Sequence, residues 1–141
     1  MNPQEFTLNP SFSFQGINHV TFPVSDKMKS EAFYVGTLGL IKVPVGSSLW
    51  IRVGEQFIHL NQSAVIPSLS FVHFAIRVED LRGYLNILQN KGVDIFDLDD
   101  DLKEISLNTD FEKANRQFFL RDPDGYLLEL IDASNSFFHP V

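Results

Sequence analysis

The segment HVTFPVSD at residues 19–26 decides the fold, because the chain repeats its pattern as HFAIRVED at residues 73–80. Both copies read His, four residues, Val, one residue and Asp. The alternation along each copy is typical of a β-strand, in which His19 lies on the face opposite Val20. Asp is a preferred residue at the N-terminus of a helix. The repeat therefore predicts two units in which a strand leads directly into a helix.

Each Asp precedes an apolar pattern of helical period. The first helix is expected to follow Asp26 and to stop near Gly39, and the second to follow Asp80 and to stop at Gly92. The positions predicted to face the core are Met28, Phe33 and Leu38 in the first helix, and Leu81, Tyr84, Leu85 and Leu88 in the second.

Three short β-rich segments follow each helix. They are LIKVPV, SLWIRV and QFIHLN in the first half, and VDIFDL, RQFFL and YLLELID in the second. Each half therefore reads as a βαβββ module, and the fold class is α+β. His59 and Glu129 fall at equivalent positions in the two closing strands. Because the first and last strands of such a module can be neighbours, His59 is expected to approach His19, and Glu129 to approach His73.

The second half is longer because of the acidic segment at residues 99–115, which is interpreted as a mobile loop or short helix. A calcium loop beginning at Asp97 is excluded, since Leu102 stands where Gly is needed and Asn108 where Glu is needed. The DPDG sequence at residues 122–125 predicts a structural type I turn.

Composition limits the possible functions. A chain of 141 residues with 44% hydrophobic residues and 14 Phe fits one globular domain with a dense core. The absence of Cys excludes thiolate metal sites and a cysteine nucleophile. A net charge of −7 with scattered Lys and Arg argues against nucleic acid as a partner. Neither a signal peptide nor a membrane-spanning segment is evident, so a cytoplasmic protein without a membrane partner is expected.

The repeated positions bring metal-ligand side chains to one polar face. His19, His59, His73 and Glu129 are predicted to converge as metal ligands, with Val20, Ile58, Phe74 and Leu130 on the opposite, helix-covered face. Three imidazoles and one carboxylate suit one divalent metal, with Zn, Ni, Co, Mn and Fe(II) all possible. An octahedral ion would keep two positions for adjacent oxygens of a small substrate.

These residues resemble a known family. The paired modules, with INHVTFPVSD, FVHFAIRVED, EQFIHLN and FFLRDPDGYLLELID, are similar to the vicinal oxygen chelate (VOC) superfamily, which includes glyoxalase I, bleomycin-binding proteins and extradiol dioxygenases. The resemblance implies a U-shaped cup of two mixed sheets around the metal. It covers residues 16–133, comprising module one at 16–63 and module two at 69–133. Residues 1–15 form an N-terminal extension and residues 134–141 a C-terminal tail.

The ligand set favours an enzyme of the glyoxalase or epimerase type, a lyase or isomerase that enolises or isomerises its substrate with Glu129 and His59 as catalytic residues. A ferrous extradiol dioxygenase is an alternative. Its iron needs a triad of two His and one carboxylate, so His59 would be one ligand too many. A fosfomycin transferase is disfavoured, because Phe119 replaces the tyrosine of that group and no cationic cluster is present. A metal-free module that binds an antibiotic-like ligand is the alternative outside enzymes.

Other residues with inward alternation are expected to line the substrate pocket. They are Trp50, Arg52, Phe57, Asn61, Arg77, Gln117 and Phe119. Arg52 and Arg77 would suit an anionic substrate group. Phe-bearing segments at both ends of the chain favour a homodimer, and the cup can close within one chain or across two.

Overall fold

The computed structural model describes residues 15–67, 72–108 and 117–134 of the chain. Module one contains β1 (His19–Val24), α1 (Lys27–Glu31), the π-helix η2 (Ala32–Thr37), β2 (Ile41–Val43), β3 (Leu49–Val53) and β4 (Gln56–Gln62). Module two contains β5 (His73–Val78), α2 (Leu81–Asn90), β6 (Phe96–Leu98), β7 (Glu104–Ser106), β8 (Gln117–Arg121) and β9 (Leu127–Asp132). The predicted α+β fold of two βαβββ modules is confirmed, with β7 as an additional strand.

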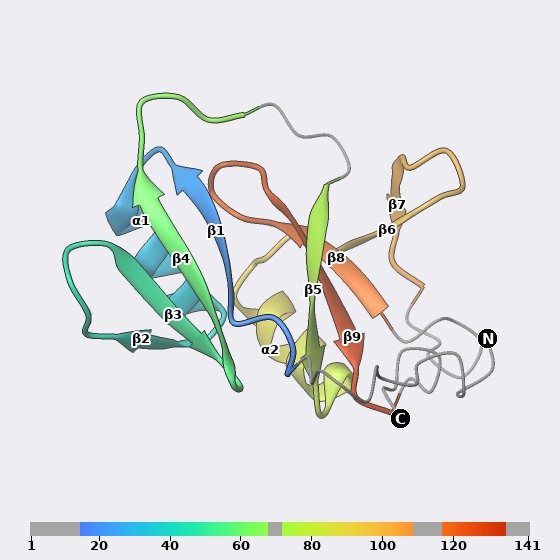
Figure 1. Cartoon of the computed structure of the whole chain (residues 1–141). Coiled ribbons are helices and arrows are strands. Elements are labelled where there is room, and N and C mark those ends of the chain that lie inside the picture. The colour runs from blue at the N-terminus through green and yellow to red at the C-terminus, as the bar shows by residue number, and fades with distance from the viewer. Residues whose placement is uncertain (1–14, 68–71, 109–116, 135–141) are drawn as a thin grey trace, which may run out of the picture.

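Each module forms its own mixed sheet (Figure 1). The strand orders are β1-β4-β3-β2 and β5-β9-β8-β6-β7. In both sheets the first strand is an edge strand and runs parallel to the last, as β1 with β4 and β5 with β9. The side-by-side placement predicted for the first and last strands is therefore correct.

The acidic segment after β6 differs from the prediction. Instead of a loop or short helix, Glu104–Ser106 forms β7 and pairs antiparallel with β6. The turn between them is organised by Asp99, whose Oδ1 accepts bonds from the backbone N–H groups of Asp101 and Lys103, both at 2.9 Å. Asp side chains often close turns in this way, so the acidic run marks a hairpin. Residues 109–115 of the predicted insertion lie outside the described residues.

Both predicted helix starts are confirmed. The Asp26 carboxylate accepts from the backbone N–H groups of Met28 and Lys29, and Asp80 accepts from that of Gly83. In α2 the residues Leu81, Leu85 and Leu88 are buried and Tyr84 packs against the core, as predicted. The prediction for Met28 is wrong, because its side chain is 78% exposed. The buried residue of α1 is Ser30, two positions after Met28 and therefore on nearly the opposite side of the helix. The regular helix ends at Glu31 and continues as η2.

The two modules share one core. The core contains Tyr34 of η2, the following Leu38 and the three buried Leu of α2. It also contains Ile58 and Leu60 of β4 and Leu128 and Leu130 of β9. Phe22 contacts both Phe74 and Tyr126 across the module boundary, with ring centroids 5.8 and 4.4 Å apart. Phe22 and Phe74 lie on the faces of β1 and β5 that are opposite to the faces carrying His19 and His73. The modules therefore pack together through their helix-covered faces.

Candidate metal-binding site

Module two holds a preformed imidazole–carboxylate pair. His73 begins β5 and Glu129 lies in the middle of β9, where Glu129 is the register partner of Ala75. The Nε2 atom of His73 lies 2.9 Å from Oε2 of Glu129, and Glu129 is only 8% exposed. The ring of Phe119 lies edge-on to His73, with centroids 5.8 Å apart. A buried carboxylate of this kind needs a polar or charged partner.

Module one holds a pair of imidazoles at the corresponding positions. His59 is the register partner of Thr21, so its place in the β1–β4 ladder matches the place of Glu129 in the β5–β9 ladder. The rings of His19 and His59 are 6.1 Å apart. Trp50 stacks on His59 with a centroid separation of 3.9 Å and an interplanar angle of 7°. The predicted equivalence of His59 and Glu129 is confirmed by the strand register.

The two pairs do not meet within one chain. Across residues 15–67, 72–108 and 117–134, no group of three or more His, Cys, Asp or Glu side chains is arranged to hold a metal ion. The cause is the packing of the modules, which contact each other through the faces opposite these pairs. Thr21 and Ala75, the register partners of His59 and Glu129, are exposed. The ligand-side row of β9 is nevertheless covered, because Leu127, Glu129 and Ile131 are only 2%, 8% and 8% exposed.

One atom in this region fits a metal ligand directly. Nε2 of His59 is buried and has no hydrogen-bond partner among the described residues, while Nδ1 lies 3.4 Å from Oγ1 of Thr21. A buried imidazole nitrogen without a partner is rare, because burial without a hydrogen bond is costly. Together with His73 and Glu129, it supplies the nitrogen and oxygen donors that borderline divalent metals prefer.

The other predicted pocket residues lie in three different places. Phe57 lies beside Trp50, and Gln117 and Phe119 occupy the same β8 row opposite Glu129, so these residues border the two pairs. Arg52 and Arg77 line a cavity between the modules that contains none of the four predicted ligands. Asn61 lies at the far end of β4, where its Oδ1 accepts a bond from Ser48 at 2.7 Å.

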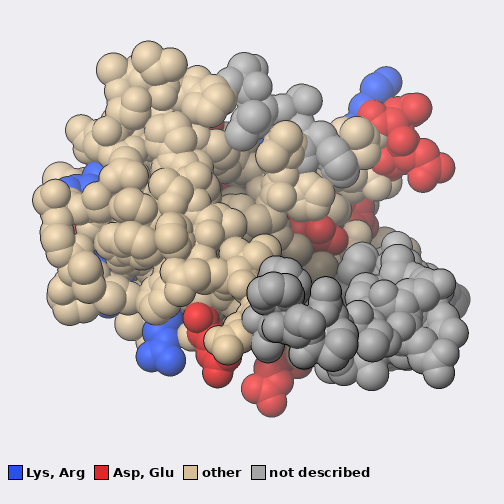
Figure 2. All heavy atoms as spheres, viewed as in Figure 1, with Lys and Arg blue, Asp and Glu red and all other residues tan. Residues whose placement is uncertain are grey.

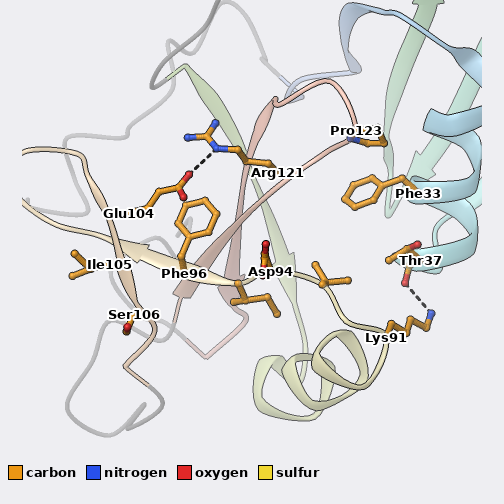
Figure 3. Close-up of a pocket in the computed structure, with 12 residues that line it drawn as sticks. Phe33, Thr37, Lys91, Asp94, Phe96, Glu104, Ile105, Ser106, Arg121 and Pro123 are labelled. Carbon is orange, nitrogen blue, oxygen red and sulfur yellow. Dashed lines mark hydrogen bonds and ion pairs between the residues drawn. The ribbon is translucent and has the colours of Figure 1, made fainter.

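A further hollow among the described residues lies away from the four predicted ligands. It has a volume of about 1030 Å³ and lies between η2, the end of α2 and the β6–β7 hairpin (Figure 3). Phe33, Phe96 and Pro123 supply apolar walls, and Lys91 and Arg121 supply charge. The sequence predictions missed Arg121, which shares the β8 row of Gln117 and Phe119. The alternation that selected those two residues would also have selected it.

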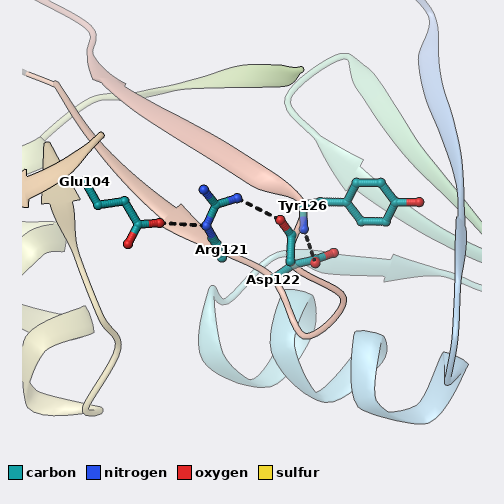
Figure 4. A network of polar contacts seen from close by, with 5 residues as sticks. Glu104, Arg121, Asp122 and Tyr126 are labelled. Atoms are coloured by element: carbon teal, nitrogen blue, oxygen red, sulfur yellow. Dashed lines mark hydrogen bonds and ion pairs between the residues drawn. The ribbon is translucent and has the colours of Figure 1, made fainter. Parts of the chain in front are cut away.

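Arg121 is held by two contacts at the edge of this hollow. Its Nε atom donates to Glu104 of β7 at 2.8 Å, and its guanidinium also donates to the Gly125 carbonyl at 2.9 Å (Figure 4). The guanidinium carbon lies 5.8 Å from the ring centroid of Phe96. These contacts tie the β6–β7 hairpin to the strand that borders Glu129. On the face in Figure 2, Lys and Arg side chains are scattered and form no cationic patch.

The DPDG turn of module two contacts module one through Asp122. The Gly125 N–H donates to the Asp122 carbonyl at 3.0 Å, which confirms the predicted turn. Oδ2 of Asp122 accepts a bond from the buried Tyr34 hydroxyl at 2.8 Å. Oδ1 of Asp122 accepts one from the Tyr126 N–H (Figure 4). Burial raises the pKa of Asp122, although the bond from Tyr34 opposes the shift. Burial, followed by the charge of Asp122, raises the pKa of Tyr34 well above its ordinary value.

Comparison with known proteins identifies the family. The family model of the Glyoxalase/Bleomycin resistance protein/Dioxygenase superfamily matches residues 16–130. The chain belongs to this superfamily, which the sequence pattern predicted.

One curated relative and two solved structures are similar to this chain. Metallothiol transferase FosB of Staphylococcus haemolyticus is 30% identical over 124 residues, which cover 82% of each chain. A glyoxalase family protein from Bacillus anthracis has a TM-score of 0.69 at 21% identity and covers 86% of this chain and 97% of its own. TnmS3, an antibiotic-binding protein from Streptomyces sp. CB03234, has a TM-score of 0.65 at 22% identity, with 87% and 99% covered. The structural likenesses show the shared fold. Among the described residues, no helix has the length and apolar character needed to cross a membrane.

Proposed function

We propose that the protein is a metal-dependent enzyme that binds one divalent ion through His73 and Glu129 of one chain and through His19 and His59 of a second copy. The observation that carries the proposal is the 2.9 Å pair of His73 and Glu129, together with the imidazole pair at the equivalent register of module one. The buried Nε2 of His59 supports the same conclusion, since a metal would satisfy it.

The site is completed across a homodimer in this proposal. Within one chain the modules pack through their helix-covered faces, so the two ligand pairs cannot share an ion without a large rearrangement. Among the described residues, β1 and β5 are both edge strands of their sheets. Ile17, two residues before β1, and Val72, directly before β5, are 69% and 67% exposed. A two-fold arrangement that sets module one of one copy against module two of the other covers these edges and forms two identical cups.

The chain's own residues suggest how such a cup would act on a small substrate with two adjacent oxygens. A bound divalent ion would supply Lewis-acid stabilisation of negative charge on those oxygens. Glu129 is one acid–base residue, and His59 is the other on the opposite wall. The Trp50 ring covers one face of the His59 imidazole and keeps water from it. Removal of a proton beside a carbonyl and its return to the neighbouring carbon gives an enolisation or isomerisation without a further reactant.

Thiol transfer to an electrophile is the second candidate. The similarity to metallothiol transferase FosB, at 30% identity over 82% of each chain, supports it. On the face drawn in Figure 2 the Lys and Arg side chains form no cationic patch, whereas a phosphonate is best held by several cationic groups. For this reason we place enolisation first.

Metal analysis tests the proposal most directly. We expect purified, untagged protein to hold about one divalent ion per chain, measured by elemental analysis, and to lose it when Glu129 is changed to Gln. The matched control is Glu55→Gln, which removes the same charge from an exposed turn. Protein that binds no divalent metal at any tested concentration would overturn the proposal and favour a sequestering module.

Two further measurements separate the remaining choices. Sedimentation should report a dimer, and mixing the inactive variants His19→Ala and Glu129→Gln should restore part of the activity, because one of the two cups in the mixed dimer then has all its ligands. Activity is measured with the hemithioacetal of methylglyoxal and glutathione, and separately with fosfomycin and L-cysteine. Turnover of fosfomycin alone would favour thiol transfer over enolisation.

A further inference from the structure

The hollow between η2, the end of α2 and the β6–β7 hairpin is separate from the candidate metal site. None of the four candidate metal ligands lines its volume of about 1030 Å³. Phe33 of η2 points into it from one side, and Phe96 of β6 borders it on the other (Figure 3). Its walls therefore come from both modules. Aromatic walls with a few charged groups are typical of small-molecule sites.

The two cations at this hollow are already engaged. The charged side chains that line it are those of Lys91, Asp94, Glu104 and Arg121. Nε of Arg121 donates to Glu104 at 2.8 Å, so these two charges cancel. Nζ of Lys91 donates to the carbonyls of Gly36 and Thr37 at 3.2 and 2.8 Å, and so turns toward η2 (Figure 3). Carbonyls at a helix C-terminus carry partial negative charge, which suits a cation.

Asp94 is the lining charge that lacks a partner. It lies between α2 and β6, and its carboxylate points into the hollow (Figure 3). Asp94 forms no hydrogen bond or ion pair within residues 15–67, 72–108 and 117–134. Its neighbours Val93 and Ile95 pack against the core and so anchor the backbone that carries it. A carboxylate beside aromatic rings favours a cationic group, because the faces of the rings also attract positive charge.

We propose that this hollow is a second binding site, which takes a small protonated amine that carries an aromatic ring. The ammonium group pairs with Asp94, and the ring packs against Phe33 and Phe96. A carboxylate in the same place would be repelled by Asp94. Because Phe33 belongs to module one and Asp94 and Phe96 to module two, the bound amine contacts both modules. It binds only the folded chain, so the melting temperature rises with its concentration.

The test uses 2-phenylethylamine, which is protonated at pH 7, on the full chain after EDTA treatment. Two-dimensional NMR follows the backbone amides of Thr37, Val93 and Phe96, which border the hollow. We expect saturable shifts that are confined to amides around the hollow. The neutral analogue 2-phenylethanol should bind about three- to fivefold more weakly, the loss expected for one partly exposed ion pair. The anion 3-phenylpropionate should bind more weakly still.

Three variants assign the contacts. Asp94→Asn should weaken binding of the amine about three- to fivefold and leave binding of 2-phenylethanol unchanged, because only the ion pair is lost. The matched control is Asp100→Asn, the same change in the exposed turn between β6 and β7, which should alter neither affinity. Phe33→Leu should weaken binding of both compounds about two- to fivefold.

Three results would overturn the proposal. They are the absence of saturable binding, equal affinity for the amine and the alcohol, and unchanged affinity for the amine in Asp94→Asn. Because the protein is free of metal in these experiments, their outcome is independent of the proposed enzyme activity.

Discussion

The two modules share a strand register but hold their candidate ligands differently. In module two, His73 and Glu129 are already joined at 2.9 Å and the carboxylate is buried. In module one, the rings of His19 and His59 are 6.1 Å apart, His19 is exposed, and the ordering contact is the stack of Trp50 on His59. Equivalent backbone positions therefore produce one pair that is already hydrogen-bonded and one pair whose rings lie farther apart. Module two should dominate metal affinity.

The largest expected effect tests this asymmetry directly. Replacing His73 by Ala should lower metal affinity by at least about 100-fold, because it removes a ligand and leaves the buried Glu129 without its partner. Replacing His19 by Ala should cost less, since His19 is exposed and belongs to no preformed pair. Competition with a fluorescent chelator measures the metal affinity of both variants. Equal losses in the two variants would contradict the asymmetry.

The contact that joins the modules offers the next largest effect. Tyr34→Phe should lower the free energy of unfolding by about 1–3 kcal/mol, because Oδ2 of Asp122 loses its partner in a buried place. Tyr126→Phe removes a bond to the neutral Pro23 carbonyl, which is worth about 1 kcal/mol. Urea titration of both variants provides the comparison. A larger loss in Tyr126→Phe would show that Asp122 is not the main polar link.

The aromatic support of module one should have a smaller effect on the metal. Trp50→Leu should weaken metal binding by about two- to tenfold, as expected when one stacked aromatic pair is lost. In module two, Phe119→Leu should change the metal affinity less, because the direct bond to Glu129 already holds His73. Isothermal titration calorimetry measures both affinities. If Phe119→Leu had the greater effect, ring contacts rather than the carboxylate would order module two.

The smallest effect concerns pH and the module boundary. Burial raises the pKa of Tyr84 from 10.0 to about 12. The folded chain therefore keeps a proton on Tyr84 that the unfolded chain releases as the pH rises from about 10 to about 12. The contribution of Tyr84 to the free energy of unfolding is fully present below about pH 10 and falls as the pH rises toward 12. We expect the Tyr84→Phe variant to lose less stability between pH 8 and pH 11 than the unchanged protein does. Urea midpoints at these two pH values provide the check, and an identical decline in both proteins would exclude Tyr84 as a cause.

Most of the fold could be predicted because its signals are local. Asp26 and Asp80 cap helices through bonds to backbone N–H groups two or three residues away, and Gly39 and Gly92 adopt positive φ just after the helices. The failures occurred where longer-range packing decides. Met28 is exposed because Ser30, two positions further on, is the residue of α1 that faces the core. The acidic segment became a hairpin because β6 offered β7 a partner.

The sequence by itself determined which residues pair within each module. Strand alternation and the repeated His…Val…Asp spacing place His19 near His59 and His73 near Glu129, and the register agrees. Only the tertiary structure decided how the modules face each other. Alternation assigns a residue to one face of a strand, whereas the choice of which faces meet depends on apolar contacts such as that of Phe22 with Phe74 and Tyr126. Because the helix-covered faces meet, the two ligand pairs point into different spaces.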